Sequence, residues 1–179
     1  MTVFFQNKIF IFDVDNTLLD WSNHTVFFHN LALSKQIIHF QKKLEHIRGQ
    51  RRNFSYESID SSAPPIADNI HSFITEIQNQ GHLIAVLSDL PHPELHPFFA
   101  QYHINVIVNG QDIKANKPLP DGLWQIQSTF SGRADQMILI GDQEYTDHRA
   151  AFNHGSRFIH VKDIKAHRWK EILAQLKED

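Results

Sequence analysis

The chain has 179 residues, 41% of them hydrophobic, which suits one domain with a substantial core and room for a small insertion. Its formal net charge is -3 and its 17 Lys and Arg residues are scattered, which argues against a nucleic-acid-binding face. It has no cysteine, no run of roughly 20 apolar residues and no secretion signal at its start, so we expect a cytoplasmic protein without disulfides, thiolate zinc sites or a membrane span.

The first predicted element is a buried strand over residues 9–12 that ends in two acids, Asp13 and Asp15. An apolar run without alternation is typical of a strand covered on both faces, and open parallel sheets carry their chemistry at the carboxyl ends of such strands. One acid can act as a nucleophile or metal ligand and the other as a general acid or base, with magnesium offsetting their repulsion. Taken alone, the two acids fit an ordinary Asp-rich turn equally well.

Residues 20–65 depart from the pattern of the rest of the chain. Apolar residues at a helical period predict a helix over about 24–49, and the polar, breaker-rich stretch 50–65 predicts a loop. We therefore expect a small helical insertion at the carboxyl end of the first strand, over the active crevice. Arg51 and Arg52 could bind phosphate groups there, or could form a solvated cluster at a helix end.

From residue 66 onward, helices and strands alternate. Helical periods occupy about 66–80, 93–102, 123–130, 145–154 and 169–176, and buried strands occupy 83–87, 104–108, 136–140 and 157–161. With the first strand, this alternation predicts an α/β fold: a doubly wound parallel sheet of five strands with right-handed crossovers. The core would comprise residues 1–19 and 66–179, and residues 20–65 would be the insertion.

Polar residues stand where the predicted strands end, and each suits the transfer of a phosphoryl group. One acid attacks, a second handles the leaving-group proton, a hydroxyl and an ammonium hold phosphate oxygens, and further acids complete a metal shell. The residues in question are Asp13 and Asp15 after the first strand, Ser88 after the second, Lys117 after the third, and Asp142 and Asp147 after the fourth.

These motifs, in this order, resemble those of the haloacid dehalogenase superfamily of aspartate-nucleophile phosphatases. Residues 13–17 resemble its first motif, Ser88 its second, residues 117–120 its third and residues 141–147 its fourth. The resemblance covers nearly the whole chain outside the insertion and implies a Rossmann-like core. It also implies that residues 20–65 are a reduced form of the helical cap found between the first and second motifs.

The resemblance implies chemical roles for four residues. Asp13 would be the nucleophile that becomes an aspartyl phosphate, and Asp15 the general acid and then the base for the hydrolytic water. Ser88 and Lys117 would bind the phosphoryl oxygens. From the residues alone, Ser88 could instead close its loop and Lys117 could be an ordinary solvated lysine.

The resemblance also implies a magnesium site. Mg²⁺ would be held by the Asp13 carboxylate, the backbone carbonyl of Asp15 and Asp142, with Asp147 orienting a bound water or Lys117. Asp147 could alternatively be an acid favoured near a helix N-terminus. Thr17 would hold the catalytic loop and is also a candidate substrate-binding residue.

The predicted function is hydrolysis of a small phosphorylated metabolite, with no nucleic acid or membrane as partner. Two alternatives stay open at this point. One is a catalytically idle relative that binds a phosphorylated ligand or a protein, and the other is a phosphomutase that returns the phosphoryl group to a sugar. If Arg51 and Arg52 contact the substrate, they would bind a second anionic group on it.

Overall fold

The computed structural model describes residues 7–19, 68–89, 96–104, 106–166 and 168–176. The chain divides into two units, Met1–Asp20 with Pro65–Asp179, and Trp21–Pro64, and every described residue belongs to the first. The helix predicted over 24–49, and Arg51 and Arg52 in the predicted loop, lie outside the described residues.

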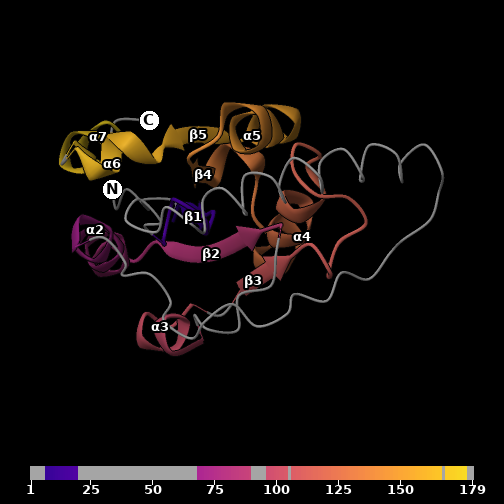
Figure 1. Ribbon diagram of the computed structural model, residues 1–179. Coiled ribbons are helices and arrows are strands. Elements are labelled where there is room, and N and C mark those ends of the chain that lie inside the picture. The colour runs from indigo at the N-terminus through magenta and orange to yellow at the C-terminus, as the bar shows by residue number, and fades with distance from the viewer. Residues whose placement is uncertain (1–6, 20–67, 90–95, 105, 167, 177–179) are drawn as a thin grey trace, which may run out of the picture. The chain divides into compact units, whose positions relative to one another are not determined.

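Five parallel strands form one sheet in the order β3-β2-β1-β4-β5 (Figure 1). The strands are β1 (Ile9–Phe12), β2 (Leu83–Ser88), β3 (Val106–Asn109), β4 (Met137–Gly141) and β5 (Arg157–His160). β1 is central and all four of its residues are buried, as the run of Ile and Phe without alternation predicts. The predicted doubly wound parallel sheet of five strands is confirmed.

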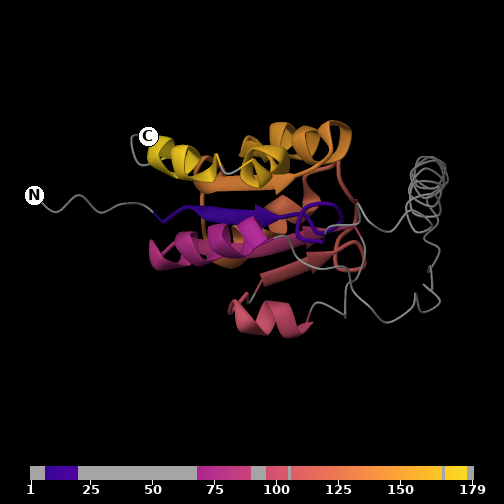
Figure 2. The same cartoon turned by 60° about the vertical axis from the view of Figure 1, so that its left-hand side comes forward.

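Helices cover both faces of this sheet. They are α2 (Asp68–Asn79), α3 (His96–Gln101), α4 (Asp121–Phe130), α5 (Arg149–His154), α6 (Val161–Lys165) and α7 (Trp169–Leu176), with a 3₁₀ turn η2 (Ala134–Gln136) and a π-helical turn η3 (Glu144–His148). As Figures 1 and 2 show, α2, α6 and α7 lie on one side of the sheet, and α4 and α5 lie on the other. Among the described residues, no helix is long and apolar enough to span a membrane.

The side chains of β1 divide between these two layers because successive residues of a strand point to opposite faces. Phe10 and Phe12 both make edge contacts with Phe73 of α2, at ring-centroid distances of 5.8 and 6.0 Å, and Trp169 of α7 lies against the same ring. On the other face, Ile9 and Ile11 pack in a cluster with buried residues of α4 and α5. The central strand is therefore fixed from both sides, which holds its carboxyl end in place.

Three elements differ from the sequence expectation. The strand predicted over 104–108 is β3 at Val106–Asn109, so it lies one to two residues later in the chain. The single helix predicted over 145–154 consists of the π-helical turn η3 followed by α5. The sequence predicts a last strand over 157–161, but β5 ends at His160 and Val161 begins α6. The reason is a cap: His160 Nδ1 accepts a 3.1 Å hydrogen bond from the backbone N–H of Lys162, which starts the helix one residue earlier than the apolar pattern indicates.

Candidate active site

The register of the sheet brings the first and fourth motifs together. Phe12 of β1 pairs with Ile140 of β4, so Asp13 emerges level with Gly141. The backbone N–H of Asp13 donates to the carbonyl of Ile140 at 2.9 Å, which continues the ladder one residue past β1. Asp13 and Asp15 are both buried, with 7% and 4% of their surfaces exposed. The two predicted catalytic acids thus lie at the carboxyl edge of the sheet, largely shielded from solvent.

Lys117 connects two of the predicted acids. Its Nζ donates to Asp13 Oδ1 at 2.6 Å and to Asp147 Oδ1 at 2.5 Å, and all three side chains are at least nine-tenths buried. Burial alone would lower the pKa of Lys117, but the attraction of Asp13, Asp147 and Asp89 outweighs it and raises that pKa well above the usual value. Lys117 is therefore a permanently charged ammonium between two carboxylates.

For the pKa of Asp147, burial outweighs the attraction of Lys117. Burial raises the pKa of its carboxyl to about 7; Lys117 lowers that pKa and the nearby Asp13 raises it. One ammonium shared by two buried carboxylates does not offset the cost of removing both from water. A bound cation would therefore stabilise the two carboxylates further.

The approach of Asp147 depends on Gly141. A Cβ atom at residue 141 would lie 2.3 Å from Asp147 Oδ2, so any larger residue would displace the carboxylate. The same oxygen accepts a 3.1 Å hydrogen bond from the backbone N–H of Gln143. The π-helical turn η3 carries Asp147 inward, while its outer residues Glu144 and Tyr145 remain exposed. Such turns occur often at functional sites.

The loop after β1 is tightly closed. The backbone N–H groups of Thr17, Leu18 and Leu19 all donate to the carbonyl of Val14, at 2.9 to 3.2 Å. Thr17 is fully buried and its Oγ1 donates to Asp13 Oδ2 at 3.3 Å. Each Asp13 oxygen thus has a hydrogen-bond donor from the chain, Lys117 on one side and Thr17 on the other. These two bonds fix the rotation of the Asp13 carboxylate.

Asp89, which we had not singled out in the sequence, holds the Lys117 loop. Its Oδ1 accepts a 3.2 Å hydrogen bond from the backbone N–H of Lys117, and its carbonyl lies 3.4 Å from Asn116 Nδ2. Gly110 permits this packing, because a Cβ there would lie 2.3 Å from the Asp89 carbonyl oxygen. The sequence could have indicated Asp89 as a site residue, because it directly follows Ser88 at a strand end, as the other site residues follow theirs.

The remaining predicted residues lie at the same edge or outside the described part of the chain. Ser88 ends β2 and is buried, with 3% of its surface exposed. Asp15 forms a bridge with Leu19. Arg51 and Arg52 are outside the described residues.

A cation could be held by three of these acids. Asp13, Asp142 and Asp147 each offer one carboxylate oxygen, and the three oxygens lie within 4.8 Å of one another. When ionised, the three carboxylates and the Lys117 ammonium leave two negative charges, which a divalent cation would balance. A donor set made entirely of oxygen suits magnesium. These residues thus fit the predicted ion. The carboxylate of Asp15 is not among the three that lie close together.

Comparison with known proteins agrees with this geometry. A family model described as haloacid dehalogenase-like hydrolase matches residues 21–161. The chain belongs to this family. The predicted membership of the haloacid dehalogenase superfamily is thereby confirmed. The matched residues contain β2 to β5 with Ser88, Lys117, Asp142 and Asp147, and they begin after β1 and Asp13.

One similar protein of assigned activity is the phosphoglycolate phosphatase of Haemophilus influenzae (strain 86-028NP). It is 23% identical over 99 residues, which are 53% of this chain and 44% of that protein. The match therefore spans less than half the length of that relative.

Solved structures share the fold of this haloacid dehalogenase-like chain. A hydrolase of the superfamily from Ehrlichia chaffeensis is 16% identical, with 95% of this chain and 98% of that one covered and a TM-score of 0.64. CbbY from Rhodobacter sphaeroides, solved in complex with phosphate, is 15% identical, with coverages of 86% and 85% and a TM-score of 0.59. At these identities the likeness concerns the fold.

Proposed function

We propose that this haloacid dehalogenase-like chain is a magnesium-dependent phosphatase that hydrolyses a small phosphomonoester through an aspartyl phosphate on Asp13. The observation that carries the proposal is the buried bridge from Asp13 through Lys117 to Asp147, with Asp142 beside it. A structural salt bridge needs no cluster of uncompensated acids at the carboxyl edge of a parallel sheet, whereas phosphoryl transfer does.

In the first step, a carboxylate oxygen of Asp13 attacks the phosphorus atom of the ester. A new P–O bond forms to Asp13 and the bond to the substrate alcohol breaks. Asp15 donates its proton to the departing alkoxide, so the alcohol leaves neutral. The bonds from Lys117 and Thr17 orient the Asp13 carboxylate before the attack, which lowers the entropic part of the barrier.

In the second step, water attacks the phosphorus atom of the aspartyl phosphate. Asp15 takes a proton from this water, the P–O bond to Asp13 breaks, and inorganic phosphate leaves with the Asp13 carboxylate restored. Both steps use the same two acids, and Asp15 ends each cycle protonated, ready to act again. Burial of Asp13 and Asp15 limits the access of other water to the intermediate.

Three groups would stabilise the phosphoryl group. Lys117 and Ser88 would contact its oxygens, and Asp13, Asp142 and the backbone carbonyl of Asp15 would hold Mg²⁺, with Asp147 beside them. When bound, the ion would supply positive charge to the phosphoryl oxygens in the transition state. We also propose that residues 20–65 act as a reduced cap over this site, with Arg51 and Arg52 as candidates for a second anionic group on the substrate.

The substrate class we propose is small phosphorylated metabolites. The relative from Haemophilus influenzae is named for its action on phosphoglycolate, a small phosphomonoester, which supports this class without selecting one compound. In the proposed cycle water accepts the phosphoryl group, so free phosphate should accumulate, whereas a mutase would return the group to a sugar.

The test is a screen of small phosphomonoesters for phosphate release by the purified protein, with Mg²⁺ and with a chelator. We expect release that requires Mg²⁺ and is lost in Asp13→Asn, because an amide is neither a competent nucleophile nor an anionic ligand. Release by Asp13→Asn at near the wild-type rate would exclude the aspartyl phosphate. Transfer to a sugar without free phosphate would indicate the mutase.

A further inference from the structure

Asn16, between the two predicted motif residues Asp15 and Thr17, has a conformation and a contact that the proposed reaction leaves unexplained. Its backbone φ is 61°, in the left-handed region that residues other than glycine seldom adopt and that Asn tolerates best. Its side-chain Nδ2 donates to Asp142 Oδ2 at 3.2 Å, across 126 residues of sequence. The left-handed turn therefore directs the side-chain amide of Asn16, in the first motif, toward the carboxylate of Asp142, in the fourth motif.

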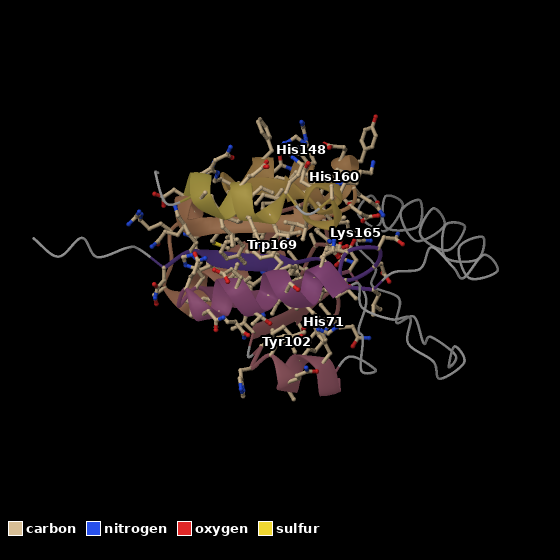
Figure 3. The ribbon with its side chains drawn as sticks, turned by 90° about the vertical axis from the view of Figure 1, so that its left-hand side faces the viewer. His71, Tyr102, His148, His160, Lys165 and Trp169 are labelled. Atoms are coloured by element: carbon tan, nitrogen blue, oxygen red, sulfur yellow. The ribbon has the colours of Figure 1, made fainter. Side chains whose placement is uncertain are left out.

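The turn is held from its other side by Lys165, at the end of α6. Lys165 Nζ donates to the carbonyl oxygen of Asn16 at 3.1 Å, and the lysine is half-buried. Figure 3 shows Lys165 at the edge of the sheet where β1 ends. The helix is itself fixed, because Asn69 of α2 donates to the carbonyl of Ile164 at 3.1 Å. Lys165 thus links the loop after β1 to a packed helix far along the chain.

We propose that Asn16 is a positioning residue for Asp142 and that Lys165 keeps Asn16 in the conformation that this requires. The inference rests on the proposed function, since it concerns the carboxylate that would bind Mg²⁺. A hydrogen bond to one oxygen of a carboxylate limits rotation of the group and so orients the other oxygen. Partners of this kind behind a metal ligand typically contribute about 10–100-fold to metal affinity.

The alternative is that Asn16 is present only because the turn needs a left-handed residue. Asn16→Gly separates the two roles, since glycine adopts positive φ without strain but carries no amide. If only the backbone matters, Asn16→Gly should bind Mg²⁺ as the wild type does. If the amide orients Asp142, the variant should fold normally and bind the ion about 10–100-fold more weakly.

Lys165 can affect Mg²⁺ binding in two ways. By holding Asn16 in position it would strengthen binding, and by its positive charge it would weaken binding. Lys165→Met removes a positive charge near the acidic cluster, which by itself would strengthen binding of a cation. It also releases the Asn16 carbonyl, which on our account weakens binding. Lys162→Met is the matched control, because Lys162 is an exposed lysine on the same helix. Lys165→Arg keeps both the charge and a donor.

The experiment is calorimetric titration of the four variants and the wild type with Mg²⁺, followed by phosphatase assays over a range of Mg²⁺ concentrations. We expect weaker binding in Asn16→Gly and Lys165→Met, affinity close to wild type in Lys165→Arg and Lys162→Met, and recovery of kcat in Asn16→Gly at saturating Mg²⁺. A merely unfolded variant would not recover in this way.

Two outcomes would overturn the inference, and they are distinct from failure of the proposed function. Equal Mg²⁺ affinity in Asn16→Gly and the wild type removes the positioning role of the amide. Tighter binding in Lys165→Met shows that Lys165 acts by charge alone. If the wild type itself binds no Mg²⁺, the proposed metal site fails, and the inference fails with it.

Discussion

In two contacts of the π-helical turn η3, a carboxylate lies at nearly the same distance from a side-chain nitrogen, but the surroundings are very different. Asp147 lies 2.5 Å from Lys117 Nζ, and the two side chains are 1% and 4% exposed. Glu144 lies 2.6 Å from His148 Nδ1, and those side chains are 61% and 52% exposed. Water and salt screen the outer pair, whereas the inner pair has neither. Burial, rather than distance, decides what each pair contributes.

The same contrast runs along the whole segment 144–154. Its inner residues Asp147, Ala150 and Ala151 are buried, and its outer residues Tyr145 and Phe152 are 90% and 68% exposed. Only the inner face carries charge that the protein must compensate. We therefore expect substitutions on this face to change both stability and chemistry, and equivalent changes on the outer face to have little effect.

The largest effect on stability should come from Lys117→Met. Removing the ammonium leaves Asp13 and Asp147 buried without their common partner, and breaking a buried pair in this way typically costs about 3–5 kcal/mol. Urea denaturation in the presence of a chelator, at a pH above the Asp147 pKa of about 7, measures the cost relative to a wild type in which Asp147 is ionised.

Lys114→Met is the control for that measurement, since Lys114 is an exposed lysine three residues earlier in the chain. It should change the free energy of unfolding by less than about 0.5 kcal/mol. A Lys117→Met protein as stable as Lys114→Met would break the comparison, because the buried acids would then not depend on the ammonium.

A smaller effect should appear as a pH dependence from His154, on the inner face of α5. Burial lowers the pKa of this imidazole, whose Nε2 lies 2.9 Å from Gln127 Oε1. The unfolded chain, with a pKa near 6.5, therefore takes up the proton first as the pH falls. The contribution of His154 to stability is present above about pH 6.5 and is lost as the pH falls through the lowered pKa of the folded state.

Denaturation at a series of pH values checks this expectation. The free energy of unfolding should decline below about pH 6.5 less steeply in His154→Gln than in the wild type, by up to about 1.4 kcal/mol per pH unit, the limit for one proton. His103→Asn, at an exposed imidazole with positive φ, is the control. Identical slopes in His154→Gln and the wild type would mean that burial of this imidazole is not linked to stability.

The smallest effect should come from Glu144→Gln, which removes the outer contact, an ion pair only while His148 is protonated. Exposed pairs of this kind contribute from nothing to about 1 kcal/mol, and we expect a loss of stability in that range that shrinks further in added salt. Thermal melting at low and high salt measures it. A loss comparable to that of Lys117→Met would contradict the claim that burial sets the difference.

Local patterns in the sequence predicted much of the fold. The run Ile9–Phe12 has no polar residue, which indicated a strand covered on both sides, and β1 is the central strand with helices on both faces. The position of Asp13 at its carboxyl end follows directly. The proximity of Lys117, 104 residues away, came from the resemblance to a family, because no local pattern encodes a contact between separate loops.

Other features could not be predicted because they depend on details that periodicity does not carry. The π-helical turn η3 shifts the helical register by a fraction of a turn, and apolar spacing over 145–154 is too coarse to show it. Val161 continued a β-branched, apolar run, but capping by His160 decided its structure. The contact between Lys165 and Asn16 joins residues 149 apart and leaves no trace in either segment.

The central claim is that Asp13 carries the phosphoryl group, and it can be tested in the Asp15→Asn variant. Loss of the general base should slow turnover by about 10²–10⁴-fold. With an aryl phosphate, whose leaving group needs little protonation, the first step should be less affected than the second, so the intermediate should accumulate.

The decisive measurement is acid quenching of Asp15→Asn after mixing with an aryl phosphate and Mg²⁺, followed by mass spectrometry of its peptides. The account predicts a phosphoryl group on the peptide that contains Asp13, absent when Asp13→Asn is added to the variant. A phosphoryl group on a different residue, or turnover of the aryl phosphate with no phosphorylated peptide at any time, would contradict it.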